Sequence, residues 1–188
     1  MILAISDGSA RVLASTASAA GLGGVIGAIM LSVWGGPKRR VYGMLAGFIG
    51  AGLSKILFGF GRSLSLWLPA QFCSSLNFPL LGSSETAIWM EKIATKNQGR
   101  VFAANALVTQ IVSAIATLIA GPLADLVFEP ALHEGSLARI FDPIFGTGAG
   151  RGTSLLYVLC SLGMLLIGIA GFYLPKLRKI DALPNLLH

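Results

Sequence analysis

Residues 64–90 read LSLWLPAQFCSSLNFPLLGSSETAIWM, and residues 101–127 read VFAANALVTQIVSAIATLIAGPLADLV. Each segment carries one formal charge, Glu85 in the first and Asp125 in the second. A helix needs roughly 20 apolar residues to cross the hydrocarbon core of a bilayer, whereas a helix on a soluble domain shows a charged stripe at helical period. The intervening residues, EKIATKNQGR, are polar and net positive. We therefore predict a transmembrane helical hairpin with a cytoplasmic elbow at residues 91–100.

The composition of the whole chain also indicates a membrane protein. Hydrophobic residues make up 54% of the sequence and charged residues 12%, and the mean hydropathy is +0.77. Soluble domains carry about 25% charged residues. The net charge of +6 comes from short Lys and Arg clusters between apolar stretches, where they orient helices in a bilayer. We therefore expect no nucleic-acid partner.

Cysteine and histidine give no catalytic or metal-binding pattern. Cys73 and Cys160 fall within apolar stretches, whereas His133 and His188 lie in a polar connection and at the terminus. This arrangement matches neither a disulfide framework nor a metal-ligand spacing. We expect no metal, no cofactor and no enzymatic activity.

Five apolar stretches predict an all-α, polytopic membrane helical bundle of about five transmembrane helices, forming one membrane domain over residues 1–188. The stretches cover residues 12–34, 41–60, 64–90, 101–127 and 153–174. Residues 128–152 contain two prolines and several glycines and predict an external loop. Residues 175–188 predict a basic cytoplasmic tail.

The distribution of Lys and Arg predicts how the helices are oriented. One set of connections contains Lys38, Arg39, Arg40, Lys92, Lys96, Arg100, Lys176, Arg178 and Lys179; the opposite set contains only Arg11, Arg62, Arg139 and Arg151. The richer side is expected to be cytoplasmic. We predict a multi-pass protein of the cell inner (plasma) membrane, with its N-terminus outside and its C-terminus cytoplasmic.

Small residues recur at a spacing of four in the first two stretches. Gly23 and Gly27 form one such pair, and Gly43 and Gly47 form another. Because lipid provides no hydrophobic drive between helices, small residues that permit close backbone approach are typical of helix contacts. We assign these four glycines to helix packing.

A polar and aromatic stripe runs along the third stretch. Gln71, Ser75, Phe78 and Glu85 share one helical face, and the fourth stretch places Asn105 and Thr109 on a comparable face. Such faces are expected to look onto a watery cavity or onto protein rather than lipid. Two interpretations stay open: these residues line a substrate cavity, or they form hydrogen bonds between helices.

Three ionisable residues lie within apolar stretches. Glu85 is the best candidate for a residue that couples transport to an ion gradient; alternatively it pairs with Arg100 or Lys92. Lys55 lies near one end of its stretch and is expected to extend towards the membrane surface. Asp125, after Gly121 and Pro122, is expected to have an interfacial role.

Several short motifs resemble the C-terminal half of a major facilitator superfamily transporter of the macrolide-efflux type. They are WGGPKRR at residues 34–40, QGRVF at 98–102, GPLAD at 121–125, VFEP at 127–130 and GAGRG at 148–152. The resemblance implies that the five stretches correspond to helices eight to twelve of a twelve-helix permease. It also implies that Gly35, Gly36, Lys38, Arg39 and Arg40 form the cytoplasmic hinge loop, although the acidic residue often found there is absent.

The resemblance further implies a function and a partner. In this family the eighth, tenth and eleventh helices line the cavity, which agrees with the polar faces described above. Transport requires two six-helix halves, so we expect a small-molecule efflux permease, coupled to an ion gradient, that is incomplete without the N-terminal transporter half. The expected partners are that half, membrane lipid and a small-molecule substrate. The alternative is a non-transporting membrane scaffold or interaction protein derived from a transporter fragment.

Overall fold

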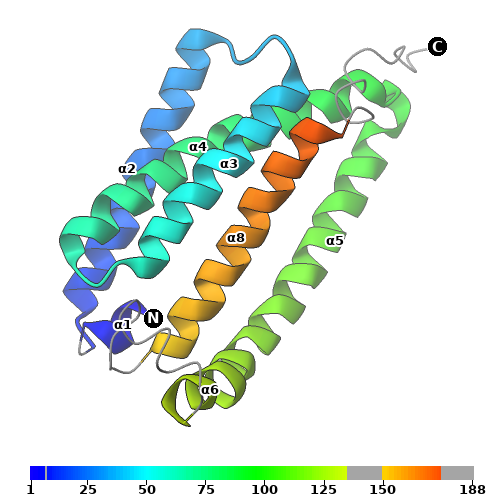
Figure 1. Ribbon diagram of the computed structural model, residues 1–188. Coiled ribbons are helices and arrows are strands. Elements are labelled where there is room, and N and C mark those ends of the chain that lie inside the picture. The colour runs from blue at the N-terminus through cyan, green and yellow to red at the C-terminus, as the bar shows by residue number, and fades with distance from the viewer. Residues whose placement is uncertain (7, 135–149, 175–188) are drawn as a thin grey trace.

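The computed structural model describes residues 1–6, 8–134 and 150–174, and this part of the chain is helical, with no strand (Figure 1). The protein is therefore an all-α helical bundle. The elements are α1 (Ile2–Ile5), α2 (Ala10–Trp34), α3 (Arg40–Phe60), α4 (Leu64–Lys92), α5 (Thr95–Pro122), η1 (Leu123–Phe128), α6 (Glu129–Glu134) and α8 (Arg151–Tyr173).

Among the described residues, four helical segments are long and apolar enough to cross a membrane. They are Ala10–Trp34, Arg40–Phe60, Thr95–Leu132 and Arg151–Tyr173. These segments indicate a membrane-embedded protein. The predicted third stretch forms α4 at the expected position and runs unbroken through Pro69 and Pro79, but its Gln, Asn, Ser and Glu side chains leave it outside this apolar group.

The predicted external loop begins later than the sequence suggested. The helix that begins at Thr95 continues past Pro122 as a turn of π-helix, η1, and then as α6 to Glu134, so the prediction of a loop from residue 128 is wrong for residues 128–134. The loop was predicted partly from its prolines, but the structure accommodates Pro130 within a helix. Pro122 lacks a backbone N–H and lies where the helix widens into η1, and Pro130 is the second residue of α6. The rest of the predicted loop and the predicted tail lie outside the described residues, apart from residues 150–152.

The helices pack as an open row rather than as a closed ring. α4 packs against α2 on one side and α3 on the other, and α3 in turn packs against α8. Figure 1 shows α5 running alongside α8 at the edge of this row, and its main contacts with the remaining helices lie near its two ends, at the elbow with α4 and through η1 with α8. α5 contains no buried residue.

Glycines set the distance between the packed helices. A Cβ atom added to Gly23 or Gly27 of α2 would collide with the backbone carbonyl of Phe72 or Leu76 in α4. On the other side of α4, a Cβ at Gly47 would lie 3.0 Å from Leu81, and one at Gly43 would lie 2.6 Å from Ser84 Oγ. The structure thus places all four glycines singled out from the sequence at helix–helix contacts.

A carboxylate fixes the start of α8. Glu129 accepts hydrogen bonds from the backbone N–H groups of Gly150, at 3.3 Å, and Gly152, at 2.6 Å. Both donors belong to the unsatisfied first turn of the helix, where a negative charge is favourable. A Cβ at Gly152 would lie 2.6 Å from the carbonyl oxygen of Ala124. This contact holds η1 and α6 against α8.

The packing contacts of α2 give a testable prediction. Gly27→Ala should destabilise the bundle by about 1–3 kcal/mol, because the new methyl group must push α2 away from the α4 backbone. Gly24→Ala is the matched control, since nothing lies within 4 Å of its added Cβ, and it should be neutral or slightly stabilising. Thermal unfolding in detergent, followed by circular dichroism, measures both. Equal melting temperatures for the two variants would contradict the close approach.

Candidate functional site

The polar stripe predicted on α4 is covered unevenly. Gln71 and Glu85 are half-buried, Ser75 is only 8% exposed, and Phe78 is 45% exposed. Glu85 faces a groove shared with α3, while Phe78 lies beside Lys55 of α3. The four side chains therefore share a face of α4 without lining one common groove.

The structure does not bring the polar residues of α4 and α5 together. Asn105 is half-buried and Thr109 is exposed, and no hydrogen bond between the side chains of these two helices occurs within the described residues. The reason is packing: the close contacts of α4 are made with α2 and α3, and α5 meets α4 only near the elbow. Within the described residues, no second helix packs closely over Thr109, and Asn105 is only half-buried.

Glu85 lies in an apolar groove of about 420 Å³ between α3 and α4. Its neighbours in this groove are Val41, Met44, Phe48, Ile88 and Trp89. The predicted alternative, a pair with Arg100 or Lys92, is not formed: Lys92 Nζ instead lies 3.4 Å from a carboxylate oxygen of Glu91.

Lys55 forms a cluster that the sequence did not reveal. Its ammonium group donates a hydrogen bond of 3.3 Å to the Tyr157 hydroxyl of α8. The same nitrogen lies 5.4 Å from the ring centroids of both Phe78 and Tyr157. Lys55 is half-buried at this contact; its extension towards the membrane surface stays a prediction. Two aromatic rings, from α4 and α8, lie beside it, and such contacts contribute about 0.5–1 kcal/mol at exposed sites and about 2 kcal/mol or more when the ammonium is desolvated.

Tyr157 also connects Lys55 to a second groove, of about 450 Å³, between η1 and α8. Asp125 and Thr153 line this groove together with Tyr157, and small or apolar side chains complete it. Tyr157 thus contacts Lys55 and also lines the groove that contains Asp125. This arrangement can bind a small molecule that has an apolar body and a polar group at one end.

The predicted hinge loop forms a tight turn between α2 and α3. Gly35 and Gly36 have φ angles of 78° and 77°, a left-handed conformation that favours glycine, and the Gly35 N–H donates to the Leu31 carbonyl at 2.8 Å. The Arg39 guanidinium lies 5.6 Å from the ring centroid of Tyr42. Lys38 and Arg39 are exposed, and α3 begins at Arg40.

Two side chains have structural roles that the sequence did not predict. Gln98 donates from its side-chain amide to the carbonyls of Met90, at 3.0 Å, and Ile93, at 3.1 Å, and so fixes the elbow between α4 and α5. Glu129 fixes α8 from within the predicted loop. Their polarity was visible in the sequence, but their partners depend on how the chain turns. In the described part of the chain, no group of three His, Cys, Asp or Glu side chains could hold a metal ion.

No protein-family model, curated protein or solved structure matches the chain. The interpretation of the site therefore depends on its geometry.

The Lys55 cluster gives a second prediction. Lys55→Met and Tyr157→Phe each remove one partner and keep most of the side-chain volume. We expect a coupling energy of about 0.5–2 kcal/mol between them in a double-mutant cycle. Unfolding in detergent measures the four proteins. Tyr173→Phe, at a tyrosine that is 83% exposed, serves as the control and should be additive with Lys55→Met. Additivity at Tyr157 would show that the hydrogen bond between Lys55 and the Tyr157 hydroxyl contributes nothing to stability.

Proposed function

We propose that the chain is the C-terminal part of a secondary active transporter, a small-molecule efflux permease of the major facilitator type driven by an ion gradient. The proposal is supported mainly by α5, which is long enough to cross a membrane and has no buried residue. A helix that lines a substrate pathway between two transporter halves needs one face that is free to meet the pathway and the partner half of the transporter.

The two sides of α5 differ in composition. Successive residues of an α-helix lie about 100° apart, so Asn105, Thr109, Gln110, Ser113 and Thr117 fall within an arc of about 140°. The opposite arc carries bulky aliphatic residues: Leu107, Val108, Ile111, Val112, Ile115, Leu118 and Ile119. Polar side chains at membrane depth are normally covered by protein or face a water-filled cavity. The aliphatic arc suits lipid, and the polar arc suits the substrate pathway.

The distribution of charge supports a specific orientation. The turn after α2, the elbow after α4 and the end of α8 lie at one end of the bundle (Figure 1). This end carries Lys38, Arg39, Arg40, Lys92, Lys96 and Arg100, whereas the described residues of the opposite end carry Arg11, Arg62 and Arg151. By the positive-inside rule, the first end is cytoplasmic. The N-terminus then lies on the outer side of the inner (plasma) membrane.

Within this proposal, Glu85 couples transport to the ion gradient. Its carboxyl group is half-buried in an apolar groove and makes no ion pair with a residue that the structure describes. An ionisable side chain within a membrane-spanning transporter segment is by default a candidate for carrying a proton. In this proposal, Glu85 takes up and releases that proton at the α3–α4 contact.

A membrane scaffold is the second candidate function. It is favoured by the same uncovered side of α5, since a partner protein would bind it equally well. The two candidates differ in what moves across the membrane: the transporter uses the polar arc as a pathway, whereas the scaffold keeps it permanently covered.

The two arcs of α5 give a third prediction, tested with photocrosslinkers attached to single cysteines in a chain lacking Cys73 and Cys160. In native membranes, Thr109→Cys and Ser113→Cys should crosslink to protein, and Ile111→Cys and Leu118→Cys should crosslink to lipid. All four positions are exposed in this chain, so the difference reports on what lies around it. Lipid adducts at all four positions would contradict both candidate functions.

Transport itself provides the fourth prediction. In vesicles that contain the chain with its membrane partners, a proton gradient should drive accumulation of fluorescent efflux substrates. Glu85→Gln keeps the shape of the side chain but cannot ionise, so accumulation should fall to the level of vesicles without the protein. Glu91→Gln, at an exposed residue of the elbow, is the control and should remain active. Gradient-driven accumulation that survives in Glu85→Gln would exclude Glu85 as the coupling residue. A chain that assembles with partners but moves no substrate would favour the scaffold.

A further inference from the structure

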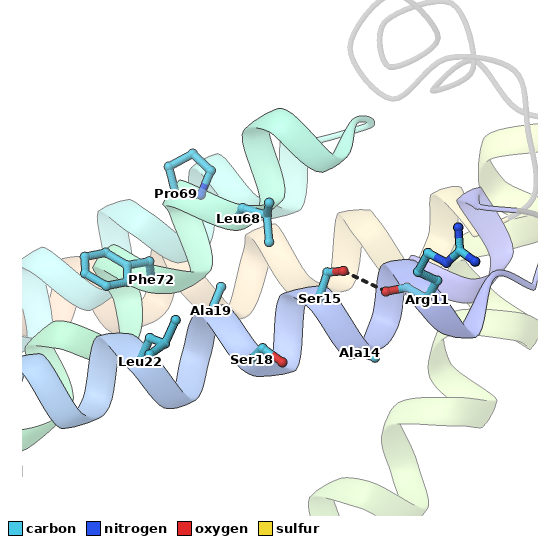
Figure 2. Close-up of a pocket in the computed structure, with 9 residues that line it drawn as sticks. All are labelled: Arg11, Ala14, Ser15, Ser18, Ala19, Leu22, Leu68, Pro69 and Phe72. Atoms are coloured by element: carbon cyan, nitrogen blue, oxygen red, sulfur yellow. Dashed lines mark hydrogen bonds between the residues drawn. The ribbon is translucent and has the colours of Figure 1, made fainter.

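A groove of about 630 Å³ separates α2 from α4 at the end of the bundle where both helices begin (Figure 2). It is distinct from the α3–α4 groove of Glu85 and from the η1–α8 groove of Asp125. The residues that give it its chemical character are Arg11, Ser15, Ser18 and Leu22 from α2, and Leu68 and Phe72 from α4. Small alanines of α2 leave the space between them.

The groove changes from charged to apolar along its length. Arg11 stands at one end, in the first turn of α2, and the hydroxyl of Ser15 donates to the Arg11 carbonyl at 2.9 Å (Figure 2). Leu22 and Phe72 lie at the other end (Figure 2). The lining contains no acidic residue, and the Arg11 guanidinium makes no ion pair with any residue that the structure describes. An occupant of matching chemistry is therefore negative at one end and apolar along the rest.

The length of the groove matches one leaflet of a bilayer. Arg11 and Leu22 are separated by eleven residues of helix, and at 1.5 Å per residue this distance is about 16 Å. The hydrocarbon core of a bilayer is about 30 Å thick, so one leaflet is about 15 Å. Because α2 begins at the end of the bundle, a headgroup at Arg11 would place a hydrocarbon chain from the membrane surface to about its centre.

We propose that this groove binds an anionic phospholipid, with the headgroup phosphate paired to Arg11 and one acyl chain lying along Leu22 and Phe72. The guanidinium presents several N–H donors to a phosphate. The acyl chain packs along the apolar end of the groove. The occupant differs from a transport substrate in position, since it lies between α2 and α4 rather than along the polar arc of α5.

Native mass spectrometry of the purified full chain tests the proposal with two probes, phosphatidylglycerol and phosphatidylcholine of the same acyl length. The unmodified chain should retain phosphatidylglycerol in preference to phosphatidylcholine. Arg11→Gln should reduce that preference about fivefold, as expected for one basic residue at a membrane surface. Arg62→Gln removes an equal charge from the same end of the bundle but does not line the groove, so the preference should remain.

The acyl chain is tested separately. Ser18→Leu fills the groove from an exposed position of α2 without changing its charge, and it should reduce retention of phosphatidylglycerol. Circular dichroism verifies that each variant remains helical. Equal losses in Arg11→Gln and Arg62→Gln would overturn the proposal in favour of general charge attraction. Displacement of the lipid by inorganic phosphate, or full retention in Ser18→Leu, would overturn it in favour of a simple anion site.

Discussion

Direct contact between helix backbones is the constraint on which the rest of this structure depends. Lipid is as apolar as the side chains it surrounds, so helices in a bilayer gain their association energy from close packing rather than from escaping water. Here α4 lies against α2 at Gly23 and Gly27 and against α3 at Gly43 and Gly47. α3 and α8 repeat the arrangement, since a Cβ at Gly52 would lie 3.0 Å from the backbone of Leu165. The packed row therefore follows the distribution of glycine.

The same constraint explains why α5 stands apart. Among the described residues, nothing lies within 4 Å of a Cβ added to its glycines, Gly99 and Gly121, and none of the residues of α5 is buried. Its position is fixed near its ends, by Gln98 at the elbow and by the continuation through η1 and α6 to α8. A helix held in this way exposes both its polar and its aliphatic sides along its length. This exposure leaves α5 available for further contacts.

The sequence predicted the helices better than it predicted their neighbours. Apolar length and charged connections located α2, α3, α4 and α8 within a few residues, because these features act locally along the chain. The spacing of Gly23 and Gly27 also pointed to a helix contact, though not to α4 as the partner. Periodicity placed Ser75 and Thr109 on polar faces, but it carries no information about whether two such faces meet. Lys55 and Tyr157 are 102 positions apart, and only the packing of α8 on α3 joins them.

The bond between Glu129 and the start of α8 has a consequence for how the chain tolerates change. The carboxylate holds Gly150 and Gly152 beside α6, so the two ends of the segment 135–149 are fixed to each other. Joining two chain positions that are already close costs only about 0.6 kcal/mol of extra closure entropy for each doubling of the number of residues between them. The register of α8 therefore depends on the contact of Glu129 with Gly150 and Gly152 more than on how many residues separate α6 from α8.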